Sequence, residues 1–287
     1  MKYQFMRFPG GKAKAVTFSY DDGFRSDLRL LETMGRYGIK GTFNITGGIL
    51  KAQPGESFLT VGEVKKYILD AGHEIAVHGM QHRAPGTQRP VQGIQDVLNC
   101  RLGLEQAFDR VIRGMAYPDT GITHFANGTQ YATVRNYLQE LDIAYARTLG
   151  GDNAQFLMPI DWYAWTPSVH HANPQALEYA KTFAQLEIPS YPARQFPRLF
   201  YLWGHSFEFE NANNWELLEQ LCTVLGNRDD IWYATNMEIY EYTQAYNSLV
   251  YSADGTRVYN PTLYQIWFTQ HGELYRIASG ETLVIPE

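Results

Sequence analysis

Residues 15–45 read AVTFSYDDGFRSDLRLLETMGRYGIKGTFNI. The apolar run at 15–20 predicts a buried strand, residues 25–36 predict an amphipathic helix, and residues 41–45 predict a second strand. Two strands joined through a helix in this way usually lie parallel in one sheet. This stretch therefore predicts a parallel sheet covered by helices.

The same alternation of strands and helices continues to about residue 235. About seven such units favour a closed barrel over an open sheet, so we expect an α/β fold with a distorted (β/α)7-type barrel. In such barrels the chemistry lies at the mouth where the strands end. Beyond residue 45, the expected strands are 73–77, 111–116, 143–146, 199–203 and 231–233, and the expected helices are 60–71, 91–110, 123–140, 174–186, 214–225 and 237–246.

The end of the chain has a different pattern, with short strands separated by tight turns at Asp254-Gly255 and His271-Gly272. We expect a catalytic domain over residues 1–248 and a small antiparallel β appendage over residues 249–287. Its strands are predicted at 249–252, 256–259, 263–268, 273–277 and 282–285.

The chain has 287 residues, of which 45% are hydrophobic, and this composition is typical of a folded globular protein. The 24 basic and 30 acidic side chains give a net charge of -6, which argues against nucleic acid as a partner. Neither an apolar stretch of membrane-spanning length nor a secretory signal is visible, so we expect a cytoplasmic protein that does not enter a membrane. The sequence leaves homo-oligomerisation open.

Two segments at predicted strand ends contain metal-binding side chains. In Asp21-Asp22-Gly23, neighbouring carboxylates on an extended backbone point to opposite sides, so one cation takes only one of them directly. Alternatively, this segment has only a structural role as a turn, because Asp-Gly is a common turn pair. The second segment contains His78 and His82, whose spacing places both imidazoles on one face of a helical turn.

Together, Asp22, His78 and His82 form a set of two imidazoles and one carboxylate that leaves positions open for water and substrate. Catalytic metal sites need such open positions, whereas structural zinc sites do not. These donors suit one divalent cation, for which zinc is our expectation, with cobalt, nickel and iron as alternatives.

With these two motifs, the sequence resembles the polysaccharide deacetylases with the NodB-homology domain, carbohydrate esterase family 4, as a divergent bacterial subgroup. The resemblance implies that Asp21 is the general base and that Asp22, His78 and His82 bind the metal. Gly79 stands where this family usually has serine or threonine, which should remove a supporting hydroxyl.

The segment Ala116 to Gly121 resembles the third motif of the family, although a plain Pro-Gly loop is an equally good reading. Ala116 replaces the arginine that orients the base, and Arg113 and Arg147 are the two candidates to supply that charge. The resemblance places Tyr117 in the wall of the substrate groove and assigns the backbone oxyanion donor to Asp119.

Two later segments resemble the remaining motifs. By resemblance, Asp161 tunes the catalytic histidine and Trp162 lines the acetyl pocket. His205 follows an apolar strand and is the implied general acid, with Trp203 beside the substrate. Other polar residues are close to these in sequence, namely His170, His171, Ser206, Glu208 and Glu210.

The implied function is a metal-dependent hydrolase that removes acetyl groups from an N-acetylated sugar or polysaccharide. An O-acetyl carbohydrate esterase would use the same residues, and an amidohydrolase acting on a small non-sugar amide is a further alternative. An inert carbohydrate-binding module is disfavoured, because burying polar groups costs free energy and a site without activity has no physical reason to keep them. The polar groups in question are Asp21, Asp22, His78, His82 and His205.

Overall fold

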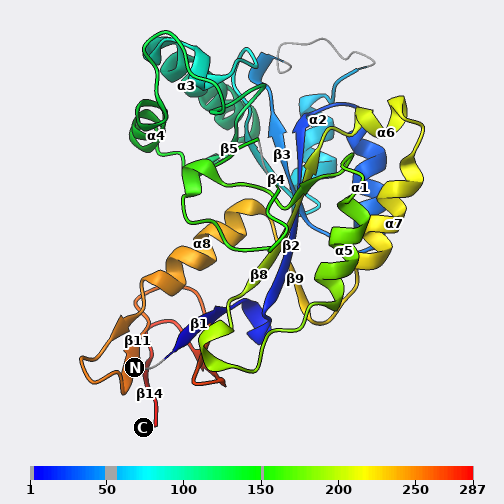
Figure 1. Cartoon of the computed structure of the whole chain (residues 1–287). Helices are drawn as coiled ribbons and strands as arrows, with labels where there is room; N and C mark the ends of the chain where they lie inside the picture. Colours follow the sequence, from blue (N-terminus) through cyan, green and yellow to red (C-terminus); the bar gives the residue numbers. More distant parts are fainter. Residues whose placement is uncertain (1–2, 49–56, 150–151, 287) are drawn as a thin grey trace.

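The centre of the molecule is a sheet of eight parallel strands in a computed structural model that describes residues 3–48, 57–149 and 152–286 (Figure 1). The strand order is β6-β5-β4-β3-β2-β8-β7, and β9 also pairs with β2. These strands are β2 (Lys14–Asp22), β3 (Gly41–Ile45), β4 (Glu74–Val77), β5 (Gly114–Ala116), β6 (Tyr145–Arg147), β7 (Val169–His170), β8 (Arg198–Gly204) and β9 (Ile231–Tyr233).

Strand β2 organises the sheet because it pairs with three neighbours. Its first residues pair with β9, its last residues pair with β3, and β8 runs along its other side. The register places Asp22 opposite Ile45 and Tyr20 opposite Gly204, while Ile45 lies opposite Val77. The carboxyl ends of β2, β3, β4 and β8 therefore meet at one edge.

The sheet curls into a barrel that one irregular segment completes between β6 and β8. Trp165 exchanges backbone hydrogen bonds with Ala146 and Thr148 at β6, whereas Ser168 and His171 donate to carbonyls of β8. One segment thus bridges two strands that do not pair directly. The predicted distorted barrel of parallel strands is confirmed, and the two-residue β7 is an addition to the expected strands.

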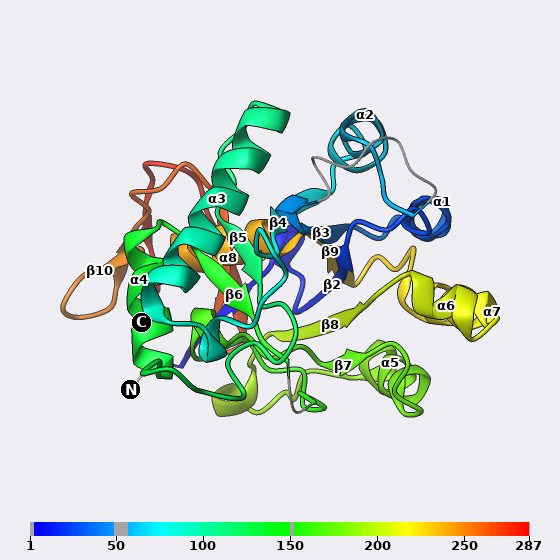
Figure 2. The same cartoon turned by 90° about the horizontal axis from the view of Figure 1, so that it is seen from above.

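Helices cover the outside of the barrel, as the view down its axis shows (Figure 2). Along β2, outward-facing Val16, Phe18 and Tyr20 belong to the core beneath the helices, while alternate residues face the interior. The helices are α1 (Asp27–Arg36), α2 (Val61–Glu63), the π-helical η3 (Val64–Leu69), α3 (Pro90–Phe108), α4 (Tyr131–Glu140), α5 (Ala176–Gln185), α6 (Phe207–Asn211), α7 (Trp215–Leu225) and α8 (Asn236–Asn247).

Helix α8 closes the end of the barrel where the strands begin. The side chain of Asn236 accepts a hydrogen bond from Thr17 and donates one to Tyr201, both from the barrel interior. Ile239 and Tyr242 pack in the same apolar cluster as Ala15 and Leu199. The opposite end, where β2 and β8 finish, is therefore the mouth.

The C-terminal strands form two small antiparallel sheets below α8 (Figure 1). Both predicted hairpins are present, and the fifth strand pairs with the first hairpin. Strand β1 (Gln4–Arg7), which the sequence did not predict, pairs with β12. The other strands are β10 (Val250–Tyr251), β11 (Arg257–Tyr259), β12 (Ile266–Gln270), β13 (Glu273–Ile277) and β14 (Thr282–Val284).

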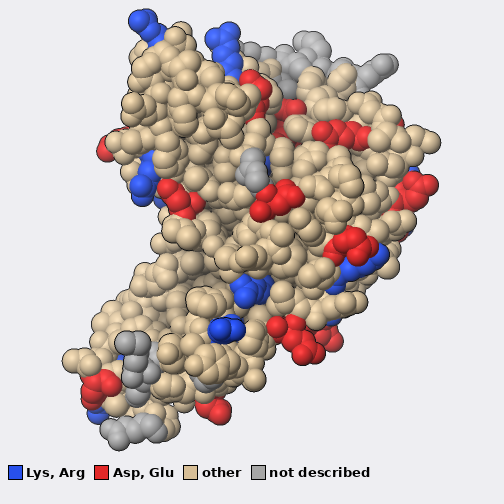
Figure 3. Space-filling model, viewed as in Figure 1, with Lys and Arg blue, Asp and Glu red and all other residues tan. Residues whose placement is uncertain are grey.

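One predicted helix begins later than expected. Residues 123–130 form turns, and α4 starts at Tyr131. Asn127 and Gly128 both have positive φ, a conformation that a helix does not accept. Within the described residues, none of the helices has the length and apolar content required to span a bilayer. On the face shown in Figure 3, charged side chains of both signs are scattered.

Candidate metal and catalytic site

Three potential metal ligands converge at the mouth of the barrel. Asp22 Oδ1 lies 3.3 Å from His82 Nε2 and 3.7 Å from His78 Nε2, and one ligand atom from each residue lies within 4.8 Å of the others. Both Nε2 atoms are buried and have no hydrogen-bond partner among the described residues. A buried polar atom without a partner costs about 1–3 kcal/mol, so this donor set fits a bound cation that would satisfy both nitrogens.

The backbone at these ligands is held in unusual conformations. Asp22 has φ 75° and His82 has φ 52°, in the left-handed region that non-glycine residues rarely adopt. Strained residues of this kind concentrate at functional sites, where the surrounding structure holds them in place. The strain therefore agrees with the assignment of both residues as ligands.

A carboxylate from α3 holds the turn that carries His82. Asp96 accepts hydrogen bonds from the backbone N–H groups of Met80 and Gln81, at 3.1 and 2.9 Å. Gly79 has φ 72°, and a Cβ there would come within 2.6 Å of Asp96 Oδ2. Asp96 thus occupies the space next to Gly79 and supports the turn in place of the expected hydroxyl.

The ring of His78 is oriented by the strand next to its own. Its Nδ1 lies 2.9 Å from the carbonyl oxygen of Ala116 and donates to it, which leaves the lone pair of Nε2 facing Asp22. Burial lowers the pKa of His78, although the carboxylates of Asp21 and Asp22 partly oppose this shift. The neutral imidazole that a metal requires is therefore favoured.

Asp21 forms a buried ion pair with Arg147, whose Nη2 lies 2.5 Å from Oδ2. Burial alone would raise the pKa of Asp21, but Arg147, His78 and His205 outweigh it and hold this pKa below its usual value. Asn44 donates to the other carboxylate oxygen at 2.8 Å. The carboxylate is thus ionised and fixed in direction, as a general base needs to be.

Of the two candidate arginines, Arg147 is the one that contacts the base. It lies at the end of β6, and its guanidinium stacks on Trp203, 4.3 Å from the ring centroid. Arg113 instead donates to the carbonyl of Asp142. The charge missing at Ala116 is therefore supplied by the neighbouring strand.

His205 lies across the site from the metal ligands. Its Nε2 is 4.0 Å from Asp21 Oδ2 and 3.9 Å from Asp22 Oδ2, and its Nδ1 donates to Glu208 at 3.3 Å. Burial lowers the pKa of His205, but Glu208, Asp21 and Asp22 together raise it above its usual value. These carboxylates therefore favour the protonated form of the ring.

The sequence model described as polysaccharide deacetylase matches residues 9–146, the segment that contains Asp21, Asp22, His78 and His82. This segment is therefore similar to the polysaccharide deacetylase family. None of the curated protein sequences matches.

Solved structures share the fold at low sequence identity. A candidate polysaccharide deacetylase from Mycobacterium smegmatis superimposes with TM-score 0.57 and 19% identity, covering 84% of this chain and 93% of that one. A family 4 acetyl xylan esterase from Clostridium thermocellum, solved with a cobalt ion, gives 0.51 and 15%, covering 80% and 92%. A family 4 carbohydrate esterase from Streptomyces lividans, solved with acetate, gives 0.51 and 14%, covering 77% and 91%.

The structure does not bring Asp161 to the catalytic histidine, contrary to the role implied by the family resemblance. Its carboxylate accepts a hydrogen bond from Tyr131 at 2.6 Å and another from the backbone N–H of Tyr163 at 2.9 Å. These contacts turn the side chain toward α4. The carboxylate beside His205 Nδ1 is that of Glu208, and the sequence indicated this residue only by its closeness to His205 along the chain.

The residues expected to line the substrate groove are only partly brought together. Trp162 packs edge-on against Trp165 and against Tyr240 of α8, and its role in lining an acetyl pocket stays a prediction. Tyr117 is fully buried. Asp119 is exposed with φ 51° in the loop after β5. Trp203, in contrast, is part of the site.

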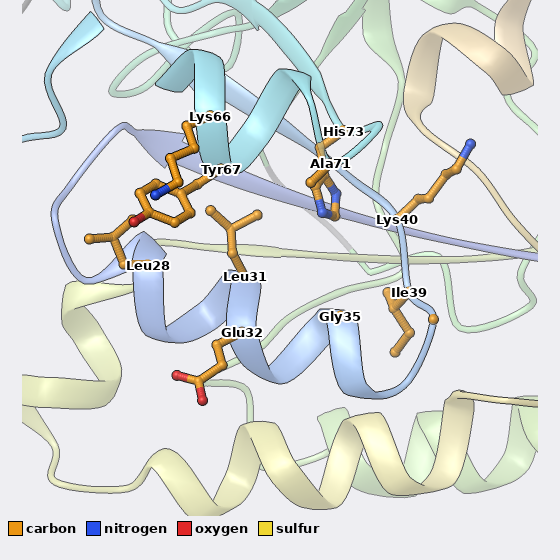
Figure 4. Close-up of a pocket in the computed structure, with 11 residues that line it drawn as sticks. Leu28, Leu31, Glu32, Gly35, Ile39, Lys40, Lys66, Tyr67, Ala71 and His73 are labelled. Atoms are coloured by element: carbon orange, nitrogen blue, oxygen red, sulfur yellow. The ribbon is translucent and has the colours of Figure 1, made fainter. Parts of the chain in front are cut away.

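A groove in another part of the described chain lies between α1 and η3 (Figure 4). Its volume is about 720 Å³, and apolar side chains such as Leu28 and Leu31 line it. The groove is on the outer side of the helices, and its histidine, His73, accepts a hydrogen bond from the backbone of Gly41. Lys40 at its rim pairs with Glu238. The chemistry is therefore assigned to the mouth of the barrel.

Proposed function

We propose that the chain is a metal-dependent hydrolase that removes acetyl groups from an N-acetylated sugar or polysaccharide. The observation that carries this proposal is the convergence of Asp22, His78 and His82, with two unpartnered imidazole nitrogens, beside the ionised Asp21. Similarity to the polysaccharide deacetylase family supports the reaction class.

Asp22, His78 and His82 would hold one divalent cation, for which zinc is proposed and cobalt, nickel or iron would also fit the donors. A divalent cation at such a site polarises the acetyl carbonyl and lowers the pKa of bound water from 15.7 toward about 7. The two nitrogens and one oxygen leave room for both water and substrate.

The protein's own groups would move the protons. Asp21 accepts a proton from the attacking water, because Arg147 and Asn44 fix its carboxylate and keep it ionised. His205 donates a proton to the departing nitrogen, since Glu208 holds its ring. A backbone N–H at Asp119 is proposed as oxyanion donor, and losing such a donor typically costs about 10²–10³ in rate.

Two alternatives use the same residues on other substrates. An O-acetyl carbohydrate esterase differs only in the leaving oxygen, and an amidohydrolase would act on a small non-sugar amide. A panel of N-acetylated sugars, O-acetylated sugars and small amides separates the three by the substrate that is hydrolysed fastest. Acetate release from N-acetylated carbohydrate at the highest kcat/KM supports the proposal.

Substitutions test the roles of the residues. We expect Asp22→Ala and His78→Ala to lose the ion held by Asp22, His78 and His82 and to lose acetate release together. Asp21→Asn should retain the metal but lose most turnover, because Asn is not a base. The exposed His124 offers a matched control, and His124→Ala should keep both properties. Unchanged turnover in Asp21→Asn would show that the base is another group.

A further inference from the structure

A second group of metal-binding side chains lies on the other side of His205. The carboxylate of Glu208, on α6, is 3.3 Å from His205 Nδ1, 3.3 Å from His170 Nε2 and 3.1 Å from His171 Nε2. His170 ends β7 and His205 follows β8, so three adjacent elements bring these groups together. One ligand atom each from His170, His205 and Glu208 lies within 4.8 Å of the others.

The spacing of these atoms is compatible with ligands of one metal ion. Charge-assisted N–H···O contacts are usually 2.7–2.9 Å long, and the pairs Lys14–Asp230 and Arg36–Glu219 of this chain are both 2.7 Å. All three imidazole contacts of Glu208 are longer. Two ligands on a tetrahedral zinc ion, each bonded at about 2.0–2.1 Å, lie about 3.3 Å apart. The pair His82–Asp22, in the first proposed metal site, has this same spacing, 3.3 Å.

The side chains are also arranged so that a cation can reach them. Glu208 offers two carboxylate oxygens, of which Oε1 faces His205 and Oε2 faces His170 and His171. The side chains of His170 and Glu208 are 24% and 30% exposed, which leaves a path from solvent.

We propose that His170 Nε2, His205 Nδ1 and Glu208 bind a second divalent cation of the zinc type. An ion on Nδ1 takes the place of the proton that His205 donates to Glu208, and this proton is released to solvent. The ring then keeps only its Nε2 proton and is a weaker acid. The second ion therefore inhibits, a consequence that rests on the proposed role of His205 as general acid.

Equilibrium dialysis against zinc, followed by metal analysis of the full chain, tests the site without reference to activity. Wild type should bind two ions, and His170→Ala should bind one. Glu208→Gln, which keeps the shape of the side chain and removes its charge, should also bind one. Glu210→Gln, an exposed residue of the same helix, is the matched control and should bind two.

Asp22→Ala separates this inference from the proposed function, because it should lose the other ion and keep the second. If Asp22→Ala still binds two ions while His170→Ala binds one, the second site is supported, and the assignment of Asp22 as a metal ligand is contradicted. In activity assays, excess zinc should inhibit wild type but not His170→Ala. The inference is overturned if wild type binds one ion that both His170→Ala and Glu208→Gln retain, since the contacts of Glu208 are then hydrogen bonds alone.

Discussion

Removal of the Arg147 charge should expose how strongly the site depends on the buried Asp21–Arg147 pair. The side chains of Arg147 and Asp21 are 0% and 2% exposed, and breaking a buried pair by removing one partner costs about 3–5 kcal/mol. In domains of 150 residues or more, 1 kcal/mol corresponds to about 2–4 °C. Arg147→Met keeps the apolar contact with Trp203 but removes the charge, so we expect a melting temperature lower by roughly 6–20 °C.

The assay is thermal unfolding in the presence of a chelator, so that no cation compensates the unpaired carboxylate. A second substitution, Asp21→Asn, supplies the control, because the double variant has no buried charge and should recover most of the loss. Without Arg147 the pKa of Asp21 should rise, which moves the acid limb of kcat/KM to higher pH. The reasoning is refuted if Arg147→Met has the melting temperature of wild type, or if the double variant has a melting temperature as low as that of Arg147→Met.

Three further predictions concern neighbouring carboxyl groups. Asp96→Ala removes two hydrogen bonds from the turn of His82 and should weaken cation binding about 10–100-fold, measured by competition with a chelator. Glu208→Gln should lower the pKa of His205 and move the alkaline limb of kcat/KM to lower pH, whereas an unmoved limb would show that Glu208 does not support the acid. Burial raises the pKa of Asp27 from 3.8 to about 8, so wild-type stability should fall as pH rises from about 4 to 8, and urea unfolding of Asp27→Asn should lack this contribution.

Elements with strong local signals were predictable from the sequence. The strands at 41–45, 231–233 and 273–277 have the predicted bounds, because apolar runs and flanking turns define them locally. Strand β1 was missed because its partner β12 lies more than 250 positions away, and nothing local shows this pairing. The two residues of β7 are too few for a periodic pattern.

Some residues of the site were also predictable from the sequence, and others were not. Asp21, Asp22, His78 and His82 follow strands whose ends meet in any parallel barrel, so their motifs predicted where they would lie. Arg147 contacts the base from a separate strand, and the sequence offered it only as one of two alternatives.

Other parts of the site depended on backbone direction, which the sequence does not show. Asp161 and Trp162 fit a motif by order along the chain, but the turn at 162–164 directs them toward α4 and α8. Glu208 reaches His205 because α6 begins immediately after it. Asp96 could be identified only when α3 was seen to pack against the turn at Gly79.

Cation titration tests the central claim most directly. Chelator-treated wild-type protein is titrated with a divalent cation while acetate release from an N-acetylated carbohydrate is followed. We predict no activity before the first addition, a rise in proportion to bound ion, a maximum at one ion per chain, and no recovery in His82→Ala. Full activity in the metal-free protein would contradict the claim that Asp22, His78 and His82 hold the cation that hydrolysis requires.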